Sequence, residues 1–187
     1  EPYAIAKISG IKICENYNRQ YGESHDIDYR CVMPANLYGP GDSYTDGNSH
    51  VIPALIRRFH EAKINKSPHV IVWGTGKPRR EFLYVDDLAE ACIKLMNLDK
   101  ITHNKITDRM STHINVGYGE DLTIEELAAT IKKIVDYKGK IKFDINMLDG
   151  TPQKILNSNK IKSLGWNAKV SLKNGLLKAY DDYLNSK

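Results

Sequence analysis

The sequence contains few cysteines and no long apolar segment, and each of these features excludes a class of protein. Only three of the 187 residues are cysteine, namely Cys14, Cys31 and Cys92. They lie in apolar segments without the spacing of a zinc site, so we expect buried free thiols in a reducing compartment. No apolar segment approaches the about 20 residues of a membrane-spanning helix. The first residues do not resemble a secretory signal, which favours a cytoplasmic protein.

Three further binding signatures are missing. The six histidines show no metal-ligand spacing, so we expect no metal site. The glycines do not form a G-x-G-x-x-G fingerprint, and GTG at residues 74–76 is too short to predict a phosphate-binding loop. The net charge is +4 and the lysines are scattered. Such a mild excess suits a phosphate-bearing small molecule but is too weak for a nucleic-acid-binding protein.

The predicted elements alternate along the chain, which indicates an α/β fold with one sizeable core rather than a helical bundle or a β-sandwich. We expect loops at residues 23–28, 35–48 and 97–112 and a hairpin-like glycine turn at 74–77. Ser49 is a candidate helix cap, and Thr123 begins a capping box. Predicted helices cover residues 3–21, about 50 onward, 86–95, 123–135, 158–164 and 171–184. Predicted strands cover residues 29–33, 69–73, 82–85, 113–116 and 140–145.

Tyr3 and Lys7 lie four residues apart in the first predicted helix, in which Pro2 is suited to the first turn. Residues at this spacing share one face of a helix, so the two side chains can converge. An ammonium group stabilises a nearby phenolate, and such a tyrosine can transfer a proton near neutral pH. The same spacing is also typical of an amphipathic surface pair. Spacing alone therefore leaves both interpretations open.

His50 lies where a polar loop meets the start of the second predicted helix. The positive end of a helix disfavours a protonated imidazole and keeps it ready for proton transfer. A histidine at a helix start can equally well face solvent without a chemical role. Both interpretations stay open from the sequence.

Four arginines and one tryptophan are candidate binding residues. Guanidinium groups match phosphate oxygens, so the arginines could clamp a diphosphate, although they could also form a solvated basic face. Trp73 precedes the glycine turn and could stack on a base or sugar, although a core tryptophan is commoner. The four arginines are Arg57, Arg58, Arg79 and Arg80.

Several motifs, in this order along the chain, resemble one enzyme family. YAIAK at residues 3–7 matches the Tyr-x-x-x-Lys signature of short-chain dehydrogenases/reductases, and PANLYGP at residues 34–40 matches a loop of their extended, sugar-nucleotide branch. NSHVIPALIRR at residues 48–58 is more specific and resembles the GDP-L-fucose synthases. Further matches are VWGTG (72–76), REFLYVDD (80–87) and DGTP (149–152). The resemblance covers essentially the whole chain, with a small insertion near residues 24–27.

This resemblance implies a bifunctional enzyme that epimerises GDP-4-keto-6-deoxy-D-mannose at C3 and C5 and reduces its 4-keto group with NADPH. It implies that Tyr3 protonates the C4 oxygen, that Lys7 holds the nicotinamide ribose, and that His50 is the acid of the epimerisations. NADP(H) would contact these three residues together with Pro34, Ala35, Asn36 and Leu37. The GDP-sugar would contact Arg58, Trp73, Arg80, Asp149 and Lys154.

The resemblance also predicts what this chain is within the family fold. We expect residues 1–48 to be the end of a Rossmann core and residues 49–187 to form mainly the substrate domain, with some segments returning to the core. The chain begins inside a predicted helix with no preceding strand, so we expect a C-terminal piece of a longer, homodimeric protein. None of the three cysteines matches the catalytic family cysteine. Since NADPH lacks a phosphate cradle here, we expect this chain alone to be inactive or nearly so.

Two alternatives stay open. The first is a neighbouring epimerase or reductase of the same branch that uses another nucleotide sugar, for example an enzyme resembling UDP-galactose 4-epimerase. The second is a non-catalytic sugar-nucleotide-binding or interaction module, because a fold alone does not determine function.

Overall fold

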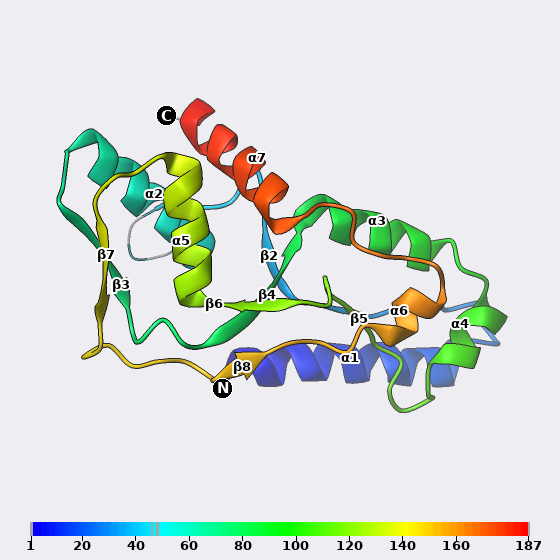
Figure 1. Ribbon diagram of the computed structural model, residues 1–187. Coiled ribbons are helices and arrows are strands. Elements are labelled where there is room, and N and C mark those ends of the chain that lie inside the picture. Colours follow the sequence, from blue (N-terminus) through cyan, green and yellow to red (C-terminus); the bar gives the residue numbers. More distant parts are fainter. Residues whose placement is uncertain (1, 46, 48, 187) are drawn as a thin grey trace.

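The computed structural model describes residues 2–45, 47 and 49–186 and confirms the predicted α/β class (Figure 1). The helices are α1 (Pro2–Tyr21), α2 (Val51–Ile64), α3 (Val85–Met96), α4 (Lys100–Ile106), α5 (Ile124–Val135), α6 (Asn159–Ser163) and α7 (Leu172–Asn185). The strands are β1 (Val32–Pro34), β2 (Asn36–Tyr38), β3 (His69–Trp73), β4 (Arg79–Tyr84), β5 (Ile114–Val116), β6 (Asp121–Thr123), β7 (Lys140–Asp144) and β8 (Gln153–Lys154). None of the helices in these ranges is long and apolar enough to cross a membrane.

The strands form three short sheets in which parallel pairs predominate. β1 pairs with β5, and β3 pairs with β7, both in parallel. β4 pairs in parallel with β2 and β8 and antiparallel with β6. It is therefore the central strand of its sheet. Because parallel neighbours need a crossover between them, helices separate the paired strands along the chain.

Two hydrophobic clusters share β4. Phe82 and Tyr84 belong to a cluster formed with α2, β3, α5 and α7, while Leu83 belongs to a second cluster with α3, β5 and α6. Successive side chains of a strand point to opposite faces, so one strand serves both clusters. We refer to α2, β3, α5, β7 and α7 together as the cavity lobe.

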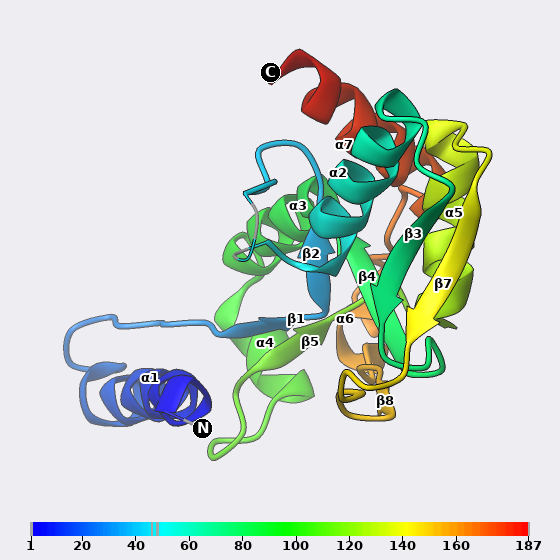
Figure 2. The same ribbon diagram turned by 90° about the vertical axis from the view of Figure 1, so that its left-hand side faces the viewer.

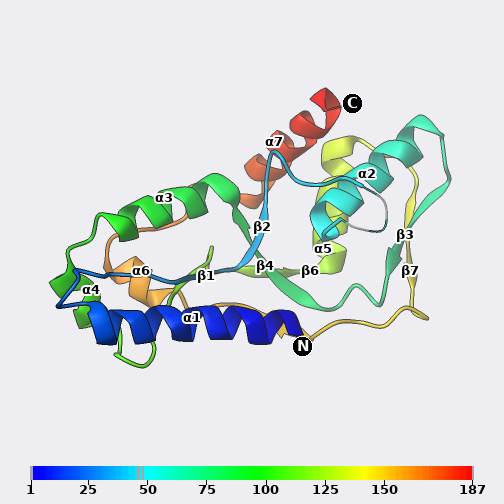
Figure 3. The same cartoon turned by 180° about the vertical axis from the view of Figure 1, so that it is seen from behind.

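The predicted helix at residues 3–21 is confirmed as α1, but several of its apolar residues are not covered. Ile5, Ile8 and Tyr17 are exposed, and the residue that α1 buries is Glu15. Figure 2 shows α1 standing apart from the cavity lobe and joined to β1 by an extended segment. Figure 3, the view from behind, shows α1 along the lower edge of the molecule.

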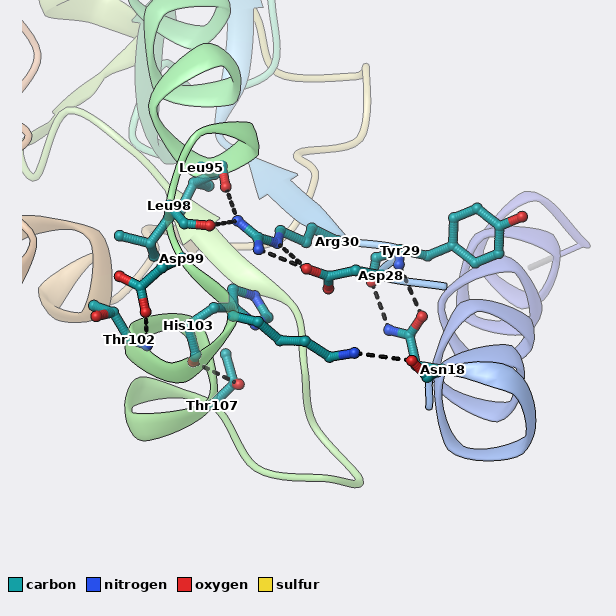
Figure 4. A network of polar contacts seen from close by, with 12 residues as sticks. Asn18, Asp28, Tyr29, Arg30, Leu95, Leu98, Asp99, Thr102, His103 and Thr107 are labelled. Atoms are coloured by element: carbon teal, nitrogen blue, oxygen red, sulfur yellow. Dashed lines mark hydrogen bonds and ion pairs between the residues drawn. The ribbon is translucent and has the colours of Figure 1, made fainter. Parts of the chain in front are cut away.

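Polar contacts tie the C-terminal end of α1 to its surroundings (Figure 4). Arg30 donates to the carbonyls of Leu95 and Leu98 at the end of α3, with 2.6 Å to the Leu98 oxygen. The Lys100 ammonium donates to the Gly22 carbonyl just after α1, at 3.0 Å. The Arg30 bonds attach the segment before β1 to the end of α3, and the Lys100 bond attaches the end of α1 to the start of α4.

Several predicted boundaries were wrong. The strand expected at 29–33 begins only at Val32, the strand expected at 82–85 begins at Arg79, and the one expected at 140–145 ends at Asp144. The loop expected at 35–48 contains β2, and the loop expected at 97–112 contains α4. Sequence analysis also missed β6 and β8. These short strands depend on pairing with β4, which is a long-range contact that local propensity does not report.

Three local predictions also need correction. The residue at the N-cap of α2 is His50 rather than Ser49, and it makes no side-chain capping bond. The glycine turn at 74–77 does not close a hairpin, because β3 pairs with β7 and β4 pairs with other strands. The three cysteines are free, as expected, but half-buried rather than buried. The capping box at Thr123 is confirmed.

Candidate functional site

A cavity of about 280 Å³ opens between α2 and the end of β3. Its floor is apolar and includes Val51, Leu55, Val72 and Ile124. Its rim is polar or aromatic and is formed by Gly47, Ser49, Arg57, Arg58 and Trp73, with Ala54 completing the lining. An apolar hollow with a few polar groups at its edge is the usual form of a small-molecule site.

Arg58 and Trp73 form the most distinctive contact of the rim. The guanidinium carbon of Arg58 lies 4.9 Å from the centre of the Trp73 ring, which is a cation–π distance. Arg58 Nη1 also lies 3.4 Å from the Ile71 carbonyl oxygen, so the side chain is directed along β3. Trp73 is 57% exposed. The interpretation of Trp73 as a core residue is therefore wrong, and its free ring face is available to a planar group.

The start of α2 lies at the other edge of the cavity. Ser49 and Val51 both line it, and between them His50 is the exposed N-cap residue. The first N–H groups of a helix have no intrahelical acceptor and carry partial positive charge, so an anion is favoured at this end. Together with Arg58, the helix start makes the cavity suited to an anionic ligand.

Asp149 fixes the turn that follows Trp73. Its Oδ1 accepts a hydrogen bond from the Thr75 N–H at 2.9 Å, and its Oδ2 accepts one from the Thr75 hydroxyl at 2.6 Å. These two bonds lower the pKa of Asp149 below its usual value. At Gly74 the φ angle is +78° and a Cβ atom would lie 2.2 Å from Asp149 Oδ1, so glycine is required at this close approach. Asp149 therefore positions the Trp73 turn.

Arg80 and Lys154 are brought side by side by the parallel pairing of β4 with β8, in which they are direct partners. Arg80 Nη1 donates to the Thr151 carbonyl at 2.6 Å, and a Cβ at Gly150 would lie 2.9 Å from Arg80 Nη2. The segment that begins at Asp149 thus links the Trp73 turn to Arg80.

The other two candidate arginines have acidic partners within the chain. Arg79 makes an ion pair of 2.8 Å with Asp121 on β6, which ties it to its own sheet. Arg57 lies 3.7 Å from Glu61, one turn further along α2. Arg57 and Arg58 thus line the cavity, whereas Arg79 and Arg80 lie on β4.

Tyr3 and Lys7 share one face of α1, as their spacing predicted. Lys7 Nζ lies 5.5 Å from the centre of the Tyr3 ring, and Tyr3 is 76% exposed. In the described ranges, α1 contributes no residue to the cavity lining. The structure therefore gathers the predicted site residues into separate groups: one on α1, one at the cavity rim, and one along β4 and β8.

The predicted cofactor loop lies at the junction of β1 and β2. The Ala35 N–H donates to the Val116 carbonyl at 2.9 Å, and Asn36 Nδ2 donates to the Glu81 carbonyl at 2.7 Å. Leu37 packs against the second hydrophobic cluster, whereas Pro34 is exposed at the end of β1. These bonds attach the segment to β5 and β4, which belong to two different sheets.

Most of the cavity floor was not predicted from the sequence. Val51 and Leu55 lie seven and three residues before Arg58, which is helical spacing, so these two apolar residues could have been found from the position of Arg58. Ile124 comes from α5, far along the chain, and no local pattern connects it with α2.

Comparison with known proteins decides the family. The model of the NAD dependent epimerase/dehydratase family matches residues 1–117. The chain belongs to this family. Members of this family are named for a nicotinamide cofactor, which agrees with the Tyr-x-x-x-Lys pair on α1.

Several family members are closely similar to the whole chain. A GDP-L-fucose synthase of Escherichia coli (strain K12) is 55% identical over 186 residues, a match that covers 100% of this chain and 57% of that protein. GDP-L-fucose synthase 1 of Arabidopsis thaliana is 50% identical over 188 residues, covering 100% of this chain and 54% of that protein. The chain thus spans little more than half the length of these curated relatives.

A solved structure shows the same arrangement. A GDP-D-glycero-L-gluco-heptose synthase from Campylobacter jejuni, determined in the presence of NADPH, aligns with a TM-score of 0.83 at 34% identity. The alignment covers 96% of this chain and 59% of that chain. The epimerase/dehydratase fold of the described residues is therefore established by both sequence and structure.

Proposed function

We propose that this chain is the substrate-binding part of a GDP-L-fucose synthase. That enzyme epimerises GDP-4-keto-6-deoxy-D-mannose at C3 and C5 and reduces its 4-keto group with NADP(H). The Arg58–Trp73 pair at the rim of the apolar cavity is the observation that supports the proposal most directly. The 55% identity to the bacterial GDP-L-fucose synthase supports the choice of substrate.

The cavity can recognise a nucleoside diphosphate through two complementary features. The exposed face of Trp73 offers a stacking surface for a purine base, and stacking on an aromatic ring is worth roughly 1–3 kcal/mol. Arg58 and the start of α2 offer positive charge for the diphosphate. We place Arg80 and Lys154 at the edge where the sugar and its phosphate would extend, with Asp149 holding the Trp73 turn in position.

The proton transfers are assigned to side chains of this chain. His50, exposed at the start of α2, would return a proton to C3 or C5 after the keto group has acidified the neighbouring C–H bonds. Tyr3 would donate a proton to the C4 oxygen, and the Lys7 ammonium beside it would stabilise the phenolate that remains. When bound, NADPH supplies the hydride for C4.

The residues of this chain fit one end of that cofactor. Tyr3 and Lys7 stand exposed on one face of α1 and could hold the nicotinamide ribose, with His50 and the segment from Pro34 through Ala35 and Asn36 to Leu37 beside the nicotinamide. The sequence contains no glycine-rich fingerprint for the pyrophosphate. We therefore expect this chain to bind GDP but not NADPH, and to show no turnover by itself.

The proposal includes a cytoplasmic location and a homodimer for the whole enzyme. The exposed Ile5, Ile8 and Tyr17 on α1 support the homodimer, since apolar helix faces of this kind are commonly covered in assemblies.

The test is a calorimetric titration of this chain with GDP, then UDP, then NADPH. We expect GDP to bind, UDP to bind at least tenfold more weakly, and NADPH not to bind. Trp73→Ala and Arg58→Met should each weaken GDP binding about tenfold, which corresponds to about 1.4 kcal/mol. Lys105→Ala removes one positive charge from α4, at the other end of the molecule from α2 (Figures 1 and 3), and should leave GDP binding unchanged.

Each result has a distinct meaning. Preferential binding of UDP would replace the proposal by an epimerase of the same family that uses another nucleotide sugar. GDP binding that is unaffected by both cavity variants would disprove the assignment of the cavity. If neither nucleotide binds although circular dichroism shows a cooperative melt, the substrate-binding function itself is wrong. If GDP binds but turnover stays absent after an N-terminal half from a relative is supplied, a non-catalytic binding module is favoured.

A further inference from the structure

The C-terminal half of α1 is fixed to the segment that precedes β1 by a reciprocal pair of hydrogen bonds. Asn18 Nδ2 donates to the Tyr29 carbonyl at 2.7 Å, and the Tyr29 N–H donates to Asn18 Oδ1 at 2.8 Å. Figure 4 shows both bonds between the helix and the extended chain. The chain reverses direction between these residues, so the extended segment runs antiparallel to the helix.

The Asn18–Tyr29 bonds determine which residues of α1 lie opposite which residues of the extended segment. Cys14 lies four residues before Asn18, a distance of about 6 Å along a helix, and on the same helical face. Cys31 lies two residues after Tyr29, a distance of about 6.6 Å along an extended chain, and on the same side. The two distances nearly agree, so the pairing brings Cys14 opposite Cys31.

Hydrogen bonds to residues 112–114 also hold the surroundings of Cys14 and Cys31 in place. Glu15 Oε1 accepts a hydrogen bond from the Thr112 N–H at 3.1 Å. Two residues after Thr112, the Ile114 N–H donates to the Cys31 carbonyl at 2.9 Å. The residue next to Cys14 and the backbone of Cys31 are therefore both attached to the start of β5, which limits how far the two cysteines can separate.

The two thiols lie in a half-buried environment. Cys14 and Cys31 are both free. Burial, followed by the neighbouring Cys14 thiol and the Glu15 carboxylate, raises the pKa of the Cys31 thiol to about 11. The thiolate is the reactive form of cysteine, so the raised pKa slows direct attack by Cys31 on an external oxidant at neutral pH.

We propose that Cys14 and Cys31 form a redox modification site that a low-molecular-weight disulfide converts into an intramolecular disulfide. In the first step the Cys14 thiolate attacks one sulfur of the small disulfide, whose S–S bond breaks; a mixed disulfide forms on Cys14, and one small thiolate leaves. In the second step the Cys31 thiolate attacks Cys14 Sγ, the mixed disulfide breaks, and the second small thiolate leaves. Both protons pass to the leaving thiolates, so two protein thiols are oxidised while one disulfide is reduced to two small thiols.

The disulfide would change how α1 is held. In the reduced chain α1 buries Glu15 and is attached mainly by polar bonds near its C-terminal end. A covalent link would tie the helix that bears Tyr3 and Lys7 to the start of β1, which leads directly to Pro34. Closing the chain between residues 14 and 31 also restricts the unfolded state, so the melting temperature should rise.

The experiment exposes this chain to oxidised glutathione at mildly alkaline pH. We expect the count of free thiols to fall from three to one, the intact mass to decrease by two hydrogen atoms, and a peptide map to contain Cys14 linked to Cys31. Cys92→Ser is the matched control and should form the same link. Asn18→Ala should slow its formation at least threefold, because it removes both bonds that set the pairing, whereas Asn16→Ala on the exposed side of α1 should not.

Other outcomes overturn the proposal. A single glutathione adduct that never resolves into a link would mean that the two sulfurs cannot meet, since a disulfide requires Cβ atoms about 3.5–4.5 Å apart. A link that includes Cys92, or a disulfide between two copies of the chain, would mean that another pair is preferred. The unmodified chain decides the question by itself, so the result does not depend on the folding of a variant.

Discussion

The cavity lobe and α1 contain similar numbers of apolar positions per helical turn, but only the lobe buries them. Phe59 on α2 has no exposed surface, and its ring lies 5.7 Å from that of Tyr137 after α5. On α1, by contrast, Ile5 and Ile8 are each more than half exposed. The lobe is thus stabilised by contacts within this chain, whereas α1 presents an apolar face that the described residues leave uncovered.

The difference matters for the site. The proposed nucleotide-binding residues are held by the well-packed lobe, while the proposed proton donor Tyr3 stands on the loosely attached helix. Binding and catalysis should therefore respond differently when the structure is perturbed.

Truncation of the lobe should be far more costly than the same kind of truncation on α1. Phe59→Ala should lower the free energy of unfolding by about 3–5 kcal/mol, because it leaves a cavity in a closed core. Ile8→Ala is the matched variant and should change it by less than about 0.5 kcal/mol, since its side chain is largely in water. Urea unfolding followed by circular dichroism gives both values. Equal losses would show that α1 is as well packed as the lobe.

Glu81 on β4 connects this central strand to two segments far along the chain, and its replacement should have an intermediate effect. The side chain is buried; Oε1 accepts from the Gly119 N–H at 2.7 Å and Oε2 from the Leu156 N–H at 2.9 Å. Glu81→Gln keeps one acceptor but places an amide donor against a backbone donor, which should cost about 1–3 kcal/mol. Glu120→Gln changes an exposed carboxylate nearby and is the control. A loss shared by both variants would argue for a general charge effect.

Acidification should weaken the α1 side of the molecule through His103. Burial, and then the nearby Arg30 guanidinium, lower the pKa of His103 below its usual 6.5, although Asp28 opposes this. The unfolded chain therefore binds the proton more readily than the folded chain. The contribution to stability is fully present above pH 6.5 and is lost as the pH falls through the lowered pKa.

The measurement is urea unfolding at about pH 7.5 and about pH 5 for the unchanged chain and for His103→Gln. The unchanged chain should lose more stability on acidification than the variant does. Because the two proteins differ only at residue 103, the difference between their pH dependences isolates His103. An identical pH dependence would mean that the folded state accommodates the charged imidazole.

Local sequence signals predicted the elements whose cause is local. β3 was predicted with its correct bounds, and the α5 start at Thr123 was predicted because a capping box satisfies the N–H groups of that helix within four residues. β6 and β8 escaped prediction because each is stabilised by pairing with β4 rather than by its own composition. The α1 helix was predicted correctly, but its apolar periodicity could not reveal that this chain leaves the face exposed.

The features of the candidate site also fall into those that the sequence could reveal and those that it could not. Arg58, Trp73 and the Tyr3–Lys7 pair could be named from the sequence because their residue types and spacing suggest particular chemistry. Their geometry is also partly local: Lys7 reaches Tyr3 within one helical turn. The sequence did not indicate that Arg58 stacks against Trp73, that Asp149 is committed to Thr75, or that Arg79 is committed to Asp121.

The α/β class, most of the helices and the family motifs could be predicted because they depend on residue type, periodicity and short spacing. Three features follow from tertiary contacts instead: the stacking of Arg58 on Trp73, the uncovered face of α1, and the proximity of Cys14 to Cys31. Each of these depends on a partner far along the chain, and the energy of such a contact appears only when strand pairing and helix packing bring the two segments together.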